Sequence, residues 1–156
     1  MSELAQLTPD ALFKLVNYAV LPFWALLILL PHFKLTDWLV HSVLMPLVLG
    51  VLYLWLFATA TFAPPGMPEG ASFSSLEGVM KAFTVKQLVV AGWTHYLVFD
   101  LFVGAWEARD AQRLGLNHFV LIPCLVLTLF VGPIGLLLYL MIRGLAGKGG
   151  WSLFEG

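Results

Sequence analysis

Charged residues are scarce in this chain of 156 residues: Lys, Arg, Asp and Glu make up 11%, and the formal net charge is -1. An ordinary soluble domain has about 25% charged residues. The chain has no excess of basic residues, which argues against a nucleic-acid partner. Hydrophobic residues make up 60% of the sequence, so we predict an integral membrane protein with the lipid bilayer as its surroundings.

Cysteine is almost absent as well. The single Cys124 excludes an internal disulfide framework and any metal cluster built from cysteines alone, and we expect it to be a small buried apolar residue. The start of the chain has neither the basic region and cleavage site of a secretory signal nor an Arg/Ser-rich transit segment. We therefore expect the chain to remain as it is made.

Four long apolar segments dominate the rest of the chain. We predict membrane spans at residues 10–30, 37–62, 86–111 and 118–144, because crossing the hydrocarbon core takes about 20 residues. Prolines lie inside three of these spans and predict kinks there: Pro22, Pro46, Pro123 and Pro133. The predicted fold class is all-α, an integral membrane four-helix bundle in a single domain over residues 1–156.

The stretch between the second and third spans, residues 63–83, differs in composition because it begins with prolines and glycines. Within it, Ser74 and Glu77 have the spacing of a capping box. Apolar residues then follow at helical spacing: Leu76, Val79, Met80 and Phe83. This pattern predicts a short amphipathic helix lying at the membrane interface.

The distribution of Lys and Arg predicts an orientation. With four spans, five basic residues fall on the side that carries both termini: Lys14, Lys81, Lys86, Arg143 and Lys148. Three fall on the other side: Lys34, Arg109 and Arg113. The positive-inside rule then places both termini in the cytoplasm.

The third predicted span contains ionisable groups. Residues 88–106 are apolar except for Thr94, His95 and Asp100. A carboxylate at that depth costs about 2.5–3.5 kcal/mol on insertion scales, which makes Asp100 a functional-site hypothesis. The alternative is that Asp100 is a structural hydrogen-bond acceptor that holds a neighbouring helix.

Helical geometry separates these groups into two stripes roughly 140° apart, at about 100° per residue. One stripe contains Trp93, Tyr96, Asp100, Gly104 and Glu107, and the other contains His95, Phe99, Phe102 and Trp106. His95 and Asp100 can therefore enter one pocket if protein surrounds the helix or if a π-bulge widens it.

A charge cluster follows the third span and contains Glu107, Arg109, Asp110 and Arg113. We expect it at the membrane surface, either as a solvated face or as a site at which the arginines pair with the acids or with a bound anion. In the four-span topology His41 and His118 lie in the same half of the bilayer as this cluster and Asp100, so these groups are able to converge there.

The sequence GWTHYLVFDLFVGAWEARDAQRLGLNHFVLIPCLVLTLFVGPIGLLLYL, with SFSSLEGV at residues 72–79, resembles the ABA-deficient-four family of small membrane proteins. The plant member of that family is required for making neoxanthin from violaxanthin. The resemblance covers roughly residues 92–139. It implies a role in carotenoid metabolism, and the lack of a plastid-targeting extension suggests a bacterial homologue in an inner or photosynthetic membrane.

The implied chemistry is an intramolecular isomerisation that opens an epoxide end group to an allene. An acid helps the epoxide oxygen leave and a base removes a proton from the polyene, with no external reductant, so no cofactor is predicted. Asp100, kept protonated by burial, is the expected acid and His95 the expected base, with Tyr96 or Glu107 as substitutes. The expected substrate-binding residues for a carotenoid or other isoprenoid lipid are Trp93, Phe99, Phe102, Trp106, His118, Asn17 and His41.

Other functions fit the same residues. The protein can be a non-catalytic subunit that binds an isoprenoid or another lipid, in which case Asp100 and His95 hold structure. A small transporter is a further alternative, but one intramembrane Asp and no visible inverted repeat argue against it. The histidines and Asp100 lack tight ligand spacing, so no metal site is predicted. The sequence carries no signal for an oligomeric state.

Overall fold

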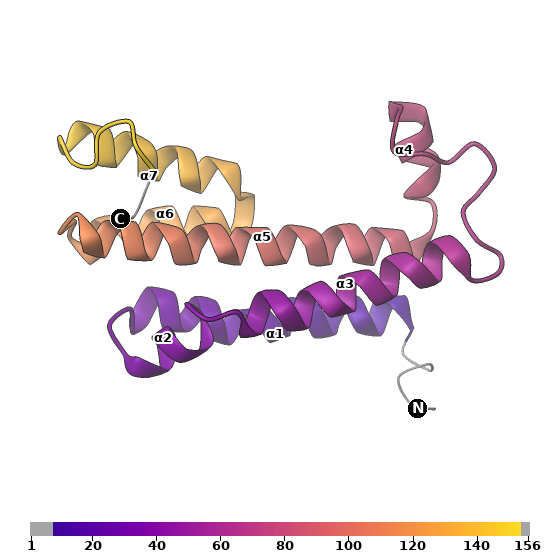
Figure 1. Cartoon of the computed structure of the whole chain (residues 1–156), viewed down its shortest axis with the longest axis horizontal. Coiled ribbons are helices and arrows are strands. Elements are labelled where there is room, and N and C mark those ends of the chain that lie inside the picture. Colours follow the sequence, from indigo (N-terminus) through magenta and orange to yellow (C-terminus); the bar gives the residue numbers. More distant parts are fainter. Residues whose placement is uncertain (1–7, 154–156) are drawn as a thin grey trace. The chain divides into compact units, whose positions relative to one another are not determined.

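The computed structural model describes residues 8–153, and within that range the chain forms seven helices and no strand (Figure 1). The helices are α1 (Pro9–Leu29), α2 (Lys34–Leu39), α3 (Leu44–Phe62), α4 (Leu76–Ala82), α5 (Lys86–Arg113), α6 (His118–Val131) and α7 (Pro133–Leu145). The all-α prediction is confirmed. Among the described residues, three stretches are long and apolar enough to cross a membrane: Pro9–Leu29, Lys34–Phe62 and Lys86–Arg113.

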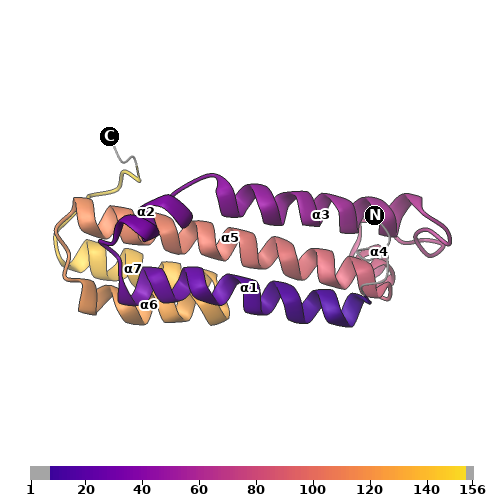
Figure 2. The ribbon, with the colours of Figure 1, turned by 90° about the horizontal axis from the view of Figure 1, so that it is seen from below.

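The second predicted span is interrupted near its start. Helix α2 ends at Leu39 and α3 begins at Leu44 (Figure 2). The Ser42 hydroxyl lies in the gap, where it donates to the Leu39 carbonyl at 3.3 Å and accepts from the Leu44 amide at 3.1 Å. Pro46 therefore lies in the first turn of α3, where proline is tolerated, and the prediction that it kinks the interior of a span is wrong.

The fourth apolar segment is also divided into two helices. The segment predicted as a fourth span over residues 118–144 forms two helices, because α6 ends at Val131 and α7 starts at Pro133, which is one of the predicted kink sites. Gly132 between them has φ +48°, a conformation that favours glycine. Pro133 thus begins α7, where its missing amide costs nothing. The two helices fold back and pack against each other (Figures 1 and 2).

The chain divides into two compact units. The first unit consists of residues 1–19 and 46–96, described from residue 8 onward. Its core has two small clusters of buried residues, Leu12, Leu56, Val90 and Ala91 in one and Ala60, Ala82 and Leu88 in the other. Helix α4 joins the second cluster through Ala82, and its start is capped by Ser75, which accepts from the Gly78 amide at 3.1 Å. The predicted cap at Ser74 is therefore wrong by one residue.

The apolar residues of α4 point outward. Leu76 and Met80 are 79% and 67% exposed, whereas Gly78 and Ala82 are buried. A short helix with an exposed apolar side fits the predicted place at a membrane interface.

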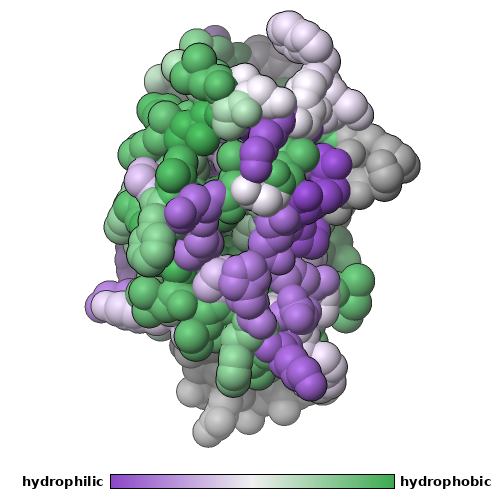
Figure 3. All heavy atoms as spheres, turned by 90° about the vertical axis from the view of Figure 1, so that its left-hand side faces the viewer, coloured by the Kyte–Doolittle hydropathy of each residue, from purple (hydrophilic) through white to green (hydrophobic). Residues whose placement is uncertain are grey.

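The second unit consists of residues 20–45 and 97–156, described to residue 153. Gly104 of α5 allows close packing against α1, because a Cβ at this position would lie 2.6 Å from Cη2 of the buried Trp24. At the end of α5 the Gln112 side chain donates to the Pro31 carbonyl at 3.2 Å. Figure 3 views the side of the molecule where α5 and α7 end, and there hydrophilic side chains form a band between hydrophobic ones.

Candidate functional site

An apolar pocket of about 270 Å³ lies in the first unit, and we call it the His95 pocket. Helices α3 and α5 form two of its walls, and the segments on either side of α4 form the rest. Its lining residues are Tyr53, Phe57, Phe73, Phe83, Leu88, Ala91, Gly92 and His95. Those on α5 follow the helical spacing i, i+3, i+4 and i+7, so one face of the helix supplies them all.

Aromatic rings pack closely around this pocket. The ring of Tyr53 lies 5.8 Å from that of His95 and 5.9 Å from that of Phe57, and Phe57 in turn lies 5.9 Å from Phe73. Gly92 completes the wall, because a Cβ there would lie 2.9 Å from Cε1 of Phe83. The pocket thus depends on glycine at position 92 for its space.

The chemistry of the His95 pocket is limited to two groups. Among the lining residues, His95 carries an imidazole and Tyr53 a hydroxyl, while the remainder are apolar. An imidazole accepts or donates a proton near neutral pH, and a phenol donates a hydrogen bond. Such a pocket suits an apolar ligand with one or two polar atoms.

Three predicted site residues lie together in a separate aromatic group of the same unit. The Trp93 indole donates to Oδ1 of Asn17 at 3.1 Å, and the Asn17 side chain donates to the Phe13 carbonyl at 2.7 Å. The ring of Trp93 lies 5.2 Å from that of Tyr96 and 5.4 Å from that of Phe13. These contacts link α1 to α5, and none of the four residues lines the His95 pocket.

The second unit contains a group of buried acids that we call the carboxylate cluster: Asp100, Glu107 and Asp110 of α5. The side chain of Glu107 is fully buried and accepts from the Thr128 hydroxyl of α6, at 3.0 Å through Oε1 and 3.2 Å through Oε2. The Tyr139 hydroxyl of α7 donates to Oδ2 of Asp110 at 2.6 Å. Helices α6 and α7 form a helical hairpin, and each of them therefore supplies one hydroxyl to an acid of α5.

Two arginines neutralise Asp110. Nη2 of Arg113 lies 2.7 Å from Oδ1, and Nε of Arg143 lies 3.2 Å from Oδ2. Arg143 is only 2% exposed, and its Nη2 also donates to the Gly149 and Ser152 carbonyls. Its charge is thus held by one carboxylate and the main chain that follows α7.

The solvated charged face expected at residues 107–113 is therefore wrong for the two acids. Glu107 and Asp110 have no exposed surface. The reason is the hairpin, because α6 and α7 cover this side of α5 and α7 brings in an arginine as the partner charge. A buried carboxylate is stable only when such partners are present.

Asp100 lies beside the turn of the hairpin. Its side chain is 8% exposed, and its Oδ1 would be 2.8 Å from a Cβ added to Gly132. Gly104 and Glu107 are buried with it, so the predicted stripe of α5 does face protein along this part of the helix. The environment of Asp100 is thus the short connection between α6 and α7.

The other predicted residues of the second unit have their own partners. Nδ1 of His41 lies 3.3 Å from Nη1 of Arg109, so these two groups are in contact. Nε2 of His118 lies 2.8 Å from the Ile28 carbonyl, a contact that ties α6 to α1. Phe99 is 55% exposed and faces outward.

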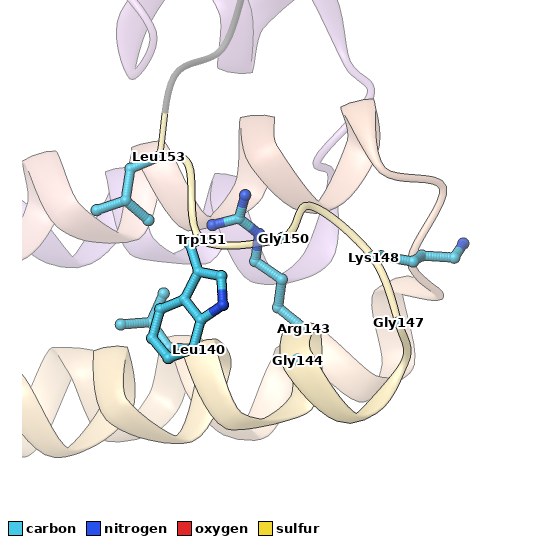
Figure 4. A pocket seen from close by; sticks show the side chains of 8 residues that line it. All are labelled: Leu140, Arg143, Gly144, Gly147, Lys148, Gly150, Trp151 and Leu153. Atoms are coloured by element: carbon cyan, nitrogen blue, oxygen red, sulfur yellow. The ribbon is translucent and has the colours of Figure 1, made fainter.

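Phe102 and Trp106 line a pocket of about 240 Å³ that is entirely apolar, together with Val103, Leu136 and Leu153. A third pocket, of about 610 Å³, lies between the end of α7 and the segment that follows it (Figure 4). There the Trp151 ring lies beside Leu140, while the Lys148 side chain points away and donates to the Leu114 and Gly115 carbonyls at 2.8 and 2.7 Å. Neither pocket contains an acid and a base together.

His95 belongs to the first unit and Asp100 to the second. Their pairing as base and acid stays a prediction. Within residues 8–153, no three side chains of His, Cys, Asp or Glu gather as metal ligands would.

Sequence reasoning missed several residues of these sites. In the His95 pocket they are Tyr53, Phe57, Phe73 and Phe83, and in the carboxylate cluster they are Thr128, Tyr139 and Arg143. A signal existed in both helices, because Tyr53 and Phe57 are four residues apart on α3 and Tyr139 and Arg143 are four apart on α7. Both pairs lie on one helix face, which points to a shared neighbour.

Comparison with known proteins gives two findings. A model of the family described as ABA DEFICIENT 4-like matches residues 11–139. The protein named "Protein ABA DEFICIENT 4, chloroplastic", from Arabidopsis thaliana, is 30% identical over 115 residues, which are 70% of this chain and 49% of that protein. The chain thus spans about half the length of this relative. No solved structure matches the chain.

Proposed function

Because the chain belongs to the ABA DEFICIENT 4-like family, we propose that it is a multi-pass membrane protein of carotenoid metabolism. Three apolar stretches of sufficient length support the membrane location. The observation that carries the proposal furthest is the His95 pocket, an aromatic cavity of about 270 Å³ with one imidazole in its wall. Such a cavity suits the cyclic end group of a carotenoid, with the polyene extending into the bilayer.

The proposed reaction is the isomerisation of an epoxide end group to an allenic one, as in the conversion of violaxanthin to neoxanthin. His95 takes the proton from the polyene carbon next to the epoxide, and the electrons of that C–H bond form the second double bond of the allene. The adjacent C–O bond breaks, and its oxygen receives a proton from an acid and becomes a tertiary hydroxyl. One proton leaves and one enters, so substrate and product have the same composition.

Two groups are the leading candidates for the acid. Asp100 follows His95 on α5 by five residues and is the carboxyl predicted from the sequence. Tyr53 lines the same pocket as His95 and offers a hydroxyl. Tyr96 and Glu107 are less suitable, because Tyr96 packs on Trp93 and Glu107 is held by Thr128.

The experiment compares conversion in a host that supplies violaxanthin. General acid–base groups typically contribute about 10²–10⁴-fold in rate, so His95→Gln should lose product by that factor while the protein accumulates normally. Asp100→Asn and Tyr53→Phe each remove one candidate acid, and whichever shows the comparable loss identifies the donor. Undiminished product from His95→Gln would contradict the proposed base.

A second variant tests the pocket without touching its polar groups. Gly92→Val would place atoms against Phe83 and fill space that the end group needs. The matched control is Gly50→Val on α3, because nothing lies within 4 Å of a Cβ at Gly50. We expect Gly92→Val to weaken carotenoid binding and conversion together, and equal effects of the two substitutions would argue that the pocket is not the binding site.

One observation favours a second function, a non-catalytic subunit that binds an isoprenoid beside a separate enzyme. Apart from His95 and Tyr53, the pocket offers apolar walls alone, which suffices for binding. The two functions predict different results for the same variant. His95→Gln would leave a binding subunit competent, whereas in an isomerase it would retain carotenoid and lose conversion.

A further inference from the structure

The two helices at the end of the chain are too short to cross a membrane. Helix α6 has 14 residues and α7 has 13, which at 1.5 Å per residue gives roughly 20 Å each. The hydrocarbon core is about 30 Å thick. Because α6 and α7 pack against each other, they enter and leave in opposite directions.

Close packing near the turn holds the hairpin together. A Cβ on Gly135 of α7 would overlap Thr128 and the main chain of Cys124, both on α6. The polar backbone of the turn is satisfied within the hairpin, since the Gly132 amide donates to the Thr128 carbonyl at 3.0 Å and the Gly135 amide to the Gly132 carbonyl at 3.0 Å. Gly132 itself is buried, which is the condition for irregular backbone at membrane depth.

The depth of the turn follows from its neighbour on α5. Gly132 lies against Asp100, and Asp100 is near the middle of α5, which runs from Lys86 to Arg113. The open end of the hairpin lies at the end of α5, where Arg143 pairs with Asp110. Lys148, just past α7, donates to the Leu114 and Gly115 carbonyls just past α5.

From these contacts we propose that α6 and α7 form a re-entrant hairpin that reaches the middle of the bilayer and returns to the side from which it entered. Residues 8–153 then contain three spans, not four. The segment after α7 lies on the same side as residues 114–117, and the N-terminal end of α1 lies on the opposite side. This inference does not depend on the proposed function.

The hairpin also reverses the predicted orientation, because it moves Arg143 and Lys148 to the other side. The side with the segment after α7 then has five basic residues, Lys34, Arg109, Arg113, Arg143 and Lys148, against Lys14, Lys81 and Lys86. By the positive-inside rule, the segment after α7 is cytoplasmic. Residues 63–85 are then on the non-cytoplasmic side, and the His95 pocket lies in that half of the bilayer.

Cysteine labelling in intact cells tests this inference on the full chain. In a Cys124→Ala background, single cysteines are placed by His32→Cys, Ser74→Cys and Ser152→Cys, at positions that are all exposed. His32 and Ser74 are references, because three spans and four spans both place them on opposite sides. A membrane-impermeant maleimide is applied before and after permeabilisation, and accumulation of each variant is checked in membranes.

We expect Ser74→Cys to be labelled in intact cells, and His32→Cys and Ser152→Cys to be labelled only after permeabilisation. If Ser152→Cys behaved like Ser74→Cys, with both labelled or both protected in intact cells, the two positions would lie on one side, and a fourth span would replace the hairpin. Labelling of His32→Cys and Ser152→Cys in intact cells, with Ser74→Cys protected, would keep the hairpin and overturn the orientation and the leaflet of the His95 pocket.

Discussion

Removing the charge of Asp110 should destabilise the second unit more than any other single change of charge there. Asp110 has no exposed surface and is contacted by Tyr139 at 2.6 Å, by Arg113 at 2.7 Å and by Arg143 at 3.2 Å. Asp110→Asn keeps the shape but leaves the buried Arg143 without its counter-charge. Breaking a buried ion pair in this way costs about 3–5 kcal/mol.

The same contacts predict a graded series. Tyr139→Phe removes one hydrogen bond to a charged group, worth about 1.5–3 kcal/mol. Arg113→Gln should cost under about 1 kcal/mol, because the side chain of Arg113 is 36% exposed and water replaces its partner. Glu77→Gln is the control, since it breaks the Glu77–Lys81 ion pair whose side chains are 80% and 45% exposed.

Thermal unfolding of the purified protein in detergent measures the series. At about 2–4 °C per kcal/mol for a chain of this size, Asp110→Asn should lower Tm by on the order of 10 °C. Tyr139→Phe should lower it by about half as much, and Glu77→Gln should leave it unchanged. If Asp110→Asn and Glu77→Gln gave equal Tm values, the buried network would not hold the hairpin on α5.

Two further predictions concern the hairpin. Gly132→Ala should lower Tm by more than Gly150→Ala. Both glycines have positive φ, but only Gly132 has Asp100 within 2.8 Å of an added Cβ. Equal losses of Tm would show that backbone strain, and not the contact with Asp100, accounts for the effect. Thr128→Val should lower the free energy of unfolding by about 1–3 kcal/mol, because it removes the hydroxyl that donates to Glu107. In the same melting assay, the double variant with Glu107→Gln should recover part of this loss. Additive losses would contradict the pairing of Thr128 with Glu107.

The sequence was sufficient to predict the long helices, but not the break between α2 and α3 or the path of the last two helices. Long apolar runs predict helices by composition, which is why α1 and α5 were found nearly to their ends. The same composition hides a hairpin, because a lipid-facing span and a hairpin packed on a neighbour are equally apolar. Gly132 and Pro133 together were the available signal for a break, since glycine ends helices and proline starts them.

The candidate sites were predicted in part for a similar reason. Residues on one helix can be sorted by their angle, so Asp100, Gly104 and Glu107 were placed on one stripe, although the burial of Glu107 was not predicted. Partners from other helices cannot be sorted in this way. Thr128 and Arg143 join the acids through packing between distant segments, and Tyr53 joins His95 through the approach of α3 to α5.

The measurement that tests the central claim most directly is conversion by the purified protein alone. The protein is reconstituted into liposomes that contain violaxanthin and no other protein. The pigments are then separated by chromatography, and their masses are determined by mass spectrometry. The proposed isomerase gives a new allenic carotenoid of unchanged mass, and His95→Gln gives about 10²-fold less or lower. Retention of violaxanthin by the wild-type protein with no new isomer would contradict catalysis and leave the binding subunit as the function.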